Sequence, residues 1–77
     1  MKVKIRGQSA GPAPSERVVV ISTVGGTAEV IVHKSQIEKG TMEVGVIARE
    51  RGKVLVELPR ETMSGRWRVW VPDGAEA

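Results

Sequence analysis

The stretch RWRVWV at residues 66–71 contains both tryptophans of a chain that has no Phe and no Tyr. Successive residues of a β-strand point to opposite sides of the sheet. One side of this predicted strand therefore carries one tryptophan and two valines, while the other carries Arg66, Arg68 and the second tryptophan, Trp70. We expect Trp67 to fill the core and Trp70 to face solvent among the arginines.

The composition predicts a small all-β domain. The 77 residues are 40% hydrophobic, and this content comes mainly from Val, Ile and Ala rather than from aromatic residues. β-Branched residues fit a pleated, half-buried sheet better than a helix. A chain of this length buries only about 60% of the surface that its unfolded form exposes, so we expect a single domain over residues 1–77 with a thin core.

Alternating apolar and polar residues, separated by turn formers, predict six strands. They cover residues 2–6, 17–24, 27–33, 41–49, 53–58 and 66–71. Gly25 and Gly26 favour a tight hairpin between the second and third strands, and Gly45 favours a bend in the fourth. We expect a flexible loop at 7–16 and a polar tail at 72–77.

Two connectors between these strands, at 34–40 and 59–65, are each predicted to form one helical turn. In the first connector, Ser35 and Glu38 have the spacing of a capping box. Gly40 marks the end of that turn, because glycine commonly terminates helices. The predicted connectors are therefore alike in form.

The segments at 26–46 and 52–71 match in the order of their apolar, basic and glycine positions. The match indicates either a pseudo-twofold repeat of strand, turn and strand or the ordinary periodicity of β-strands. A bend at Gly45 lets one strand serve two sheets, and closure removes the unpaired edges of short strands. We therefore predict a compact six-stranded barrel. Its predicted core is Val3, Ile5, Val18, Val20, Val30, Val32, Ile37, Val44, Val46, Val54, Val56, Leu58, Met63, Trp67, Val69 and Val71.

The residue types exclude most catalytic and metal chemistry. The chain has no Cys and one histidine, His33, which we expect to be an exposed strand residue, so the usual zinc, copper and iron sites cannot be assembled from it. Its only aspartate, Asp73, lies in the tail, and its glutamates lack the pairing of acid and base catalysis. We expect a protein that is not an enzyme and needs no cofactor or metal. No apolar run has the length of a signal peptide or membrane span, so we expect a cytoplasmic protein without membrane contact.

The formal net charge of +3 permits contact with nucleic acid without requiring it. The predicted binding residues are Arg66, Arg68 and Trp70 on the last strand, with Lys2, Lys4 and Arg6 on the first as electrostatic contributors. Exposed Trp and Arg are enriched at protein-interface hot spots, which favours a module that binds a protein partner or a second copy of itself. The alternative is a small barrel that binds single-stranded nucleic acid and stacks a base on Trp70.

Overall fold

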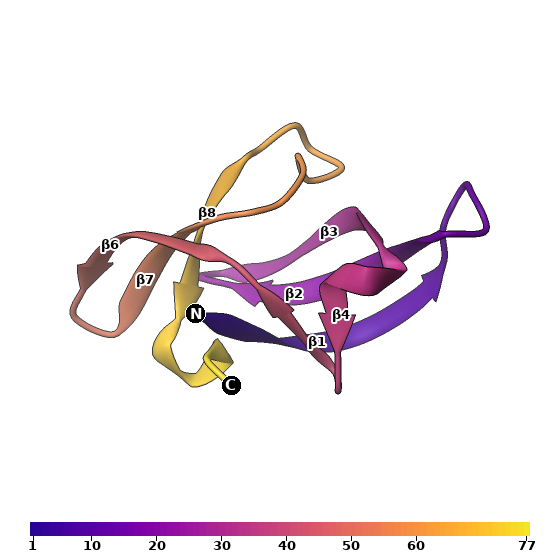
Figure 1. The fold of residues 1–77 in the computed structure, drawn as a ribbon. Coiled ribbons are helices and arrows are strands. Elements are labelled where there is room, and N and C mark those ends of the chain that lie inside the picture. The colour runs from indigo at the N-terminus through magenta and orange to yellow at the C-terminus, as the bar shows by residue number, and fades with distance from the viewer.

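The computed structural model describes all residues, 1–77, and contains eight strands and two short 3-10 turns (Figure 1). In chain order the elements are β1 (Lys2–Ala10), β2 (Glu16–Thr23), β3 (Gly26–His33), η1 (Lys34–Gln36), β4 (Ile37–Glu38), β5 (Thr41–Glu43), β6 (Gly45–Glu50), β7 (Lys53–Glu57), β8 (Arg68–Pro72) and η2 (Asp73–Ala75). The predicted all-β class is confirmed. No helix has the length and apolar character that crossing a membrane requires.

The strands form two antiparallel sheets, so the prediction of a closed six-stranded barrel is wrong. One sheet has five strands in the order β3-β2-β1-β5-β4, and the other has three in the order β6-β7-β8. The prediction rested on the need to protect strand edges. A connecting segment protects one outer edge instead: Thr62 forms a β-bridge with Val30 along the edge strand β3. Glu76 forms a second bridge with Val3 on β1, which lies inside the sheet.

One stretch of chain passes from the first sheet to the second, as the glycine pattern predicts. β5 pairs with β1, and β6 follows after the single residue Val44 and pairs with β7. Gly45 is the first residue of β6, so the change of sheet occurs where the sequence places the bend. The two chain ends lie close together (Figure 1), and Ala77 N donates to Lys2 O at 2.9 Å.

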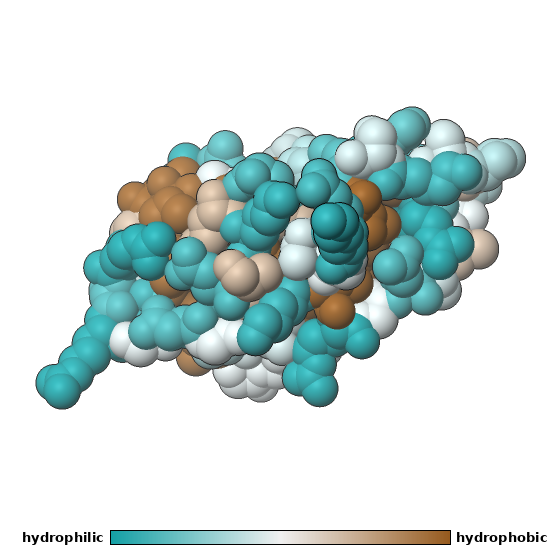
Figure 2. All heavy atoms as spheres, turned by 60° about the horizontal axis from the view of Figure 1, so that its bottom comes forward, coloured by the Kyte–Doolittle hydropathy of each residue, from teal (hydrophilic) through white to brown (hydrophobic).

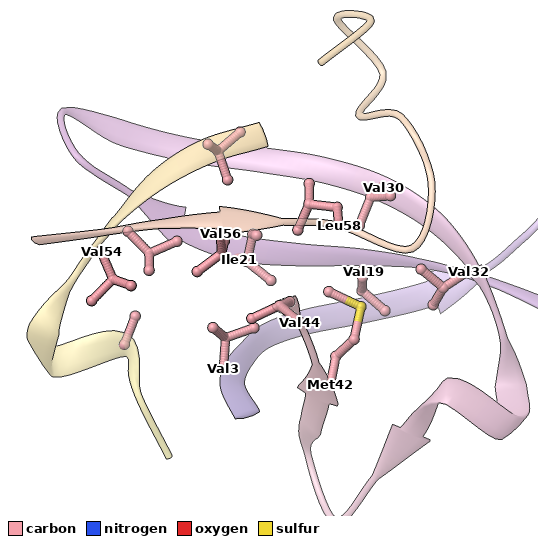
Figure 3. Close-up of a cluster of buried hydrophobic side chains, with 13 residues drawn as sticks. Val3, Val19, Ile21, Val30, Val32, Met42, Val44, Val54, Val56 and Leu58 are labelled. Atoms are coloured by element: carbon pink, nitrogen blue, oxygen red, sulfur yellow. The ribbon is translucent and has the colours of Figure 1, made fainter. Parts of the chain in front are cut away.

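The core lies between the two sheets and is built of side chains from both (Figure 3). It contains Val3, Val19, Ile21, Val30, Val32, Met42, Val44, Val54, Val56, Leu58, Val69, Val71 and Ala75. On β3, β7 and β8 the buried residues are those that alternation predicts. Ile5 and Ile37 pack against this cluster from its border. Each fully buried valine or isoleucine contributes about 1.5 to 3 kcal/mol, and no aromatic ring takes part.

The side of β2 that faces the core is the opposite of the predicted side. Val19 and Ile21 are fully buried, whereas Val18 and Val20 point outward and are half-buried. Because all four positions are apolar, alternation favours neither register, and a shift of one residue exchanges the two sides of the strand. Val18 and Val20 were predicted in the core, and this prediction is wrong: Val19 and Ile21 occupy the core instead.

Three further residues predicted in the core lie at the surface. Val46 is 42% exposed, Met63 is 65% exposed and Trp67 is 52% exposed. Trp67 precedes β8, so the alternation of that strand does not extend to it. Interior positions that the sequence did not identify are occupied by Met42 and Ala75.

The connectors differ from their prediction and from each other. The first forms η1, whose N-terminal cap is His33. The imidazole ring of His33 accepts a hydrogen bond from Ser35 N at 3.1 Å, and the backbone N–H of His33 donates to the Gln36 side chain at 3.0 Å. Glu38 is therefore not part of a capping box. The second connector, residues 59–65, contains no helix. β7 pairs directly with β8 whereas β3 does not pair with β5, so the two halves are not a structural repeat.

The segments predicted as a loop at 7–16 and a tail at 72–77 contain regular structure. β1 continues to Ala10 and pairs with β2 across a short turn. The hairpin predicted at Gly25 and Gly26 joins β2 to β3, and Gly25 has a φ of 87°. At the other end of the chain, η2 follows β8 and brings Ala75 into the core. Only the middle of the predicted loop is without strand structure.

Candidate functional site

The connector between β7 and β8 is held by hydrogen bonds along its length. Leu58 N donates to Trp67 O and Thr62 N donates to Arg66 O, both at 2.8 Å. The two arms of this β7–β8 connector therefore run side by side. Gly65 has a φ of 84° at its tip, a left-handed conformation that other residues rarely adopt.

The β7–β8 connector also covers the outer edge of β3. Met63 N donates to Glu29 O at 2.8 Å, and Thr62 forms its β-bridge with Val30 beside this bond. The backbone of the connector is thus fastened to the five-stranded sheet, while the Met63 side chain points into solvent. A fixed backbone therefore presents an exposed methionine.

Thr62 is the buried polar residue that organises the connector. It is 5% exposed, its Oγ1 accepts a hydrogen bond from Arg66 N at 3.1 Å, and the same atom lies 3.0 Å from Ser64 Oγ. No buried side-chain nitrogen or oxygen in the protein is without a hydrogen-bond partner. The hydroxyl of Thr62 thus provides the hydrogen-bond acceptor for the backbone N–H of Arg66.

Replacing Thr62 by Val is expected to lower the free energy of unfolding by about 1 to 3 kcal/mol, because the N–H of Arg66 loses its buried acceptor while the side-chain shape is kept. Urea denaturation measures the change. Ser64→Ala is the matched control: it removes an exposed hydroxyl of the same network and should change stability far less. Equal stability of Thr62→Val and native protein would contradict the organising role of this hydroxyl.

An apolar face remains open on the outer side of the five-stranded sheet. Val18 and Val20 of β2 point to this side, and Val18 lies directly opposite Ile31 of β3. Ile31 in turn lines a shallow hollow together with Met63 and Trp67. We call these five residues the outer apolar face. It continues from β2 and the edge strand β3 onto the β7–β8 connector.

No bulky side chain covers the outer apolar face from β1. The residues of β1 opposite its two valines are Gly7 and Ser9. The sequence signal for this face is the apolar run at 18–21, which is typical of a strand covered on both sides. The fold covers only one side of that run. The sequence alone does not reveal the open side, because the same apolar run would suit a strand covered on both sides.

Two carboxylates without an ion pair border the outer apolar face. Glu29 lies opposite Val20, Glu61 lines the hollow, and neither carboxylate forms an ion pair. Arg60, which lines the hollow, is neutralised, because its Nη1 lies 2.7 Å from Glu16 Oε2. Arg6 also reaches the outer side of β2, where its Nη1 donates to Ser22 Oγ at 3.3 Å. Two carboxylates are therefore left for a basic group from outside.

Trp70, the tryptophan predicted to face solvent, is half-buried on β8. Lys53 Nζ lies 4.6 Å from the centre of its ring, which is within the range of a cation–π contact. The same ammonium lies 3.5 Å from Glu50 Oε1. One face of the indole is therefore already occupied by a charged group of the protein.

Trp70 forms one wall of a hollow where the β2–β3 hairpin meets β8. Val24 N donates to Trp70 O at 2.9 Å, and this bond joins the two sheets. The hollow has a volume of about 320 Å³. It is lined by Thr23, Val24, Thr27, Ala28, Lys53, Thr62, Ser64, Arg66, Val69 and Trp70. We call it the seam hollow.

The structure does not gather the six predicted binding residues into one site. Arg66 and Trp70 line the seam hollow. Arg68 lies outside it and pairs with Glu57, with 3.0 Å between Nε and Oε2. The strand alternation that groups these three residues does not hold at Arg66, because β8 begins at Arg68.

The three basic residues of β1 are placed apart from the seam hollow. Lys4 Nζ donates to Gly74 O at 3.2 Å, and Arg6 Nη1 donates to Ser22 Oγ at 3.3 Å. Lys2 lines a separate hollow.

This separate hollow also contains Glu43. The N-terminal ammonium donates to Glu43 Oε2 at 2.6 Å, and this hydrogen bond lowers the pKa of the Glu43 carboxyl. Lys2 Nζ lies 3.6 Å from another acid of this hollow, Glu38 Oε1. The cations here are matched by carboxylates, which does not favour an anion site.

A second group of exposed apolar residues lies on β6, where Val46 and Ile47 are each 42% exposed. Figure 2 shows hydrophobic atoms gathered at the end of the molecule where β6 and β7 lie, next to a mainly hydrophilic surface. β6 is one of the two edge strands of its sheet.

Comparison of the chain with protein-family models, curated proteins and solved structures finds no match. The structure has no cluster of three or more His, Cys, Asp or Glu side chains placed to hold a metal ion. The candidate sites are therefore the outer apolar face and the seam hollow.

Proposed function

We propose that this protein is a non-catalytic module that binds a segment of another protein on its outer apolar face. The observation that carries the proposal is the joint exposure of Met63 and Trp67 on a connector whose backbone is bonded to β3. Large aromatic side chains at the centre of an apolar surface commonly carry most of the energy of a protein interface. A rigid backbone reduces the entropy that binding must overcome.

The partner segment is inferred to carry apolar side chains with Lys or Arg close by. Its apolar side chains fit the hollow between Ile31, Met63 and Trp67. Its basic group meets Glu29 or Glu61, which have no ion pair within the protein. Such charge complementarity selects the partner and its orientation more than it adds affinity. The face differs from the predicted one in its anchor, because Trp67 replaces Trp70.

A peptide library displayed on phage tests this function with a defined probe. We expect the enriched peptides to share an apolar residue near Lys or Arg. Trp67→Ala should weaken a selected synthetic peptide by about 30-fold, which corresponds to a hot-spot loss of about 2 kcal/mol. Isothermal titration calorimetry measures the affinity. The variant should stay folded, because Trp67 lies outside the core.

Arg68→Ala is the matched control, since Arg68 adjoins Trp67 in sequence, is exposed and does not line the hollow. Its peptide affinity should equal that of the native protein. Peptides that bind Trp67→Ala as tightly as native protein would refute the proposed site. Light scattering that showed a native dimer and a Trp67→Ala monomer would replace the partner segment by a second copy of this chain.

The alternative function is the binding of single-stranded nucleic acid with a base stacked on Trp70, and it has weaker support. Stacking a base on Trp70 requires an open indole face, and Lys53 lies over one face of the ring. The basic residues Lys4 and Arg6 of β1 do not line the seam hollow with Trp70. What supports the alternative is the charge of that hollow.

A further inference from the structure

The seam hollow differs from the other hollows of the protein in its charge and its hydrogen-bonding groups. Two cations, Lys53 and Arg66, line it, and no Asp or Glu does. Four hydroxyl groups, from Thr23, Thr27, Thr62 and Ser64, line it as well. The other two hollows each contain at least one Glu. A cationic lining that is rich in hydroxyl groups favours an anionic ligand with several oxygen atoms.

The two cations of the seam hollow differ in how strongly they are held by contacts within the protein. Arg66 is exposed and forms no ion pair, so its guanidinium is free to donate two parallel hydrogen bonds to an oxyanion. Lys53 is held over Trp70, and its contact with Glu50 is long, at 3.5 Å. An anion between the two cations would therefore gain electrostatic attraction without breaking a strong internal ion pair.

The position of Arg66 is set by the β7–β8 connector. Its backbone N donates to Thr62 Oγ1 at 3.1 Å, and its backbone O accepts from Thr62 N at 2.8 Å. Ser64 Oγ lies 3.0 Å from Thr62 Oγ1 and lines the same hollow. The guanidinium is thus attached to a backbone fixed on both sides, next to a hydroxyl that can donate to the same anion.

We propose that the seam hollow binds a phosphate group, with Arg66 and Lys53 as the cations and Ser64 as a hydroxyl donor. The volume of about 320 Å³ is at the low end for ligand sites, which suits a phosphate with one small attached group. The attached group contacts the half-buried wall formed by Trp70. The phosphate can belong to a small phosphorylated molecule or to the backbone of a single-stranded nucleic acid. The site uses neither Met63 nor Trp67, so it is independent of the proposed protein interface.

Fluorescence of Trp70 tests the proposal directly. The change Trp67→Phe leaves Trp70 as the sole tryptophan and removes no residue of the seam hollow. This protein is titrated with inorganic phosphate, ribose 5-phosphate and an oligothymidylate single strand, with uncharged ribose as the control ligand. We expect saturable changes in Trp70 emission with at least one phosphate probe and none with ribose. Saturation with ribose 5-phosphate identifies a small-molecule site, and saturation with the oligonucleotide alone identifies a backbone phosphate.

Variants at two arginines separate a built site from general surface charge. Arg66→Ala should weaken binding at least 10-fold, and Arg66→Lys should restore part of the loss because it keeps the charge but not the paired donors. Arg68→Ala should bind as the parent protein does, since Arg68 lies outside the hollow and pairs with Glu57. The proposal is overturned if no phosphate probe alters Trp70 emission. It is equally overturned if Arg66→Ala binds unchanged, or if Arg68→Ala loses as much affinity as Arg66→Ala. Thermal melts of each variant confirm that it is folded.

Discussion

Replacement of Ile21 by Ala is expected to lower the free energy of unfolding by about 2 to 5 kcal/mol, the range for deleting a large aliphatic side chain from a packed interior. Ile21 of β2 is fully buried, and the core around it contains no aromatic ring. A domain of 77 residues has a total stability of roughly 4 to 12 kcal/mol. The variant is therefore expected to melt far below the native protein or to be unfolded.

The adjacent residue supplies the control for Ile21. Val20→Ala removes apolar atoms from the half-buried outer side of the same strand and should cost only about 1 kcal/mol. Urea denaturation of both variants gives the comparison. A larger loss for Val20→Ala than for Ile21→Ala would place Val18 and Val20 in the core. The outer apolar face would then not exist.

Gly11→Ala is expected to destabilise the protein by about 3 kcal/mol, the upper part of the range for an overfilled site. A Cβ at Gly11 would lie 2.6 Å from Glu16 C, 2.7 Å from Glu16 O and 2.9 Å from Arg17 N. These are backbone atoms, so no side-chain rotation relieves the contact. Gly11 N also donates to Glu16 O at 3.0 Å, so separating the two segments breaks the closing bond of the β1–β2 turn.

Gly7→Ala is the matched control in the same hairpin. A Cβ at Gly7 meets no atom within 4 Å, and Gly7 does not have a positive φ. Its free energy of unfolding should stay within about 0.5 kcal/mol of the native value, as for most surface substitutions. Thermal melts of the two variants measure the difference. Equal melting temperatures for Gly11→Ala and Gly7→Ala would show that the turn is not packed as described.

The strand segments and most of the core were predictable because they depend on local alternation. On β3, β7 and β8 the side opposite the buried residues carries charged side chains, among them Glu29, Glu57 and Arg68, so one register buries more apolar surface than the other. On β2 both registers bury apolar atoms, and only the packing of the sheets selects Val19 and Ile21. Whether the strands close into a barrel was not predictable, because this depends on which segments cover the edges of the sheets.

The candidate sites were predictable only in part. Exposed Trp and Arg on the last strand were expected, but Trp67 lies at the surface instead of in the core, because β8 begins one residue after it. Trp70 is half-buried rather than exposed. The partner of Trp67 in the hollow, Ile31, comes from β3, and no local pattern relates the two residues. Lys53 over Trp70 likewise depends on the pairing of β7 with β8, which places Leu55 opposite Trp70 and brings Lys53 alongside.

The solvent exposure of Trp67 is tested most directly by acrylamide quenching of a protein that carries Trp70→Phe, in which Trp67 is the sole fluorophore. An indole that is 52% exposed should be quenched far more readily in the isolated protein than a buried tryptophan, although less readily than free tryptophan. It should become protected when a selected peptide is added. A Trp67 that resists acrylamide in the isolated monomer would place this ring in the interior and contradict both the fold of the β7–β8 connector and the binding face built on it.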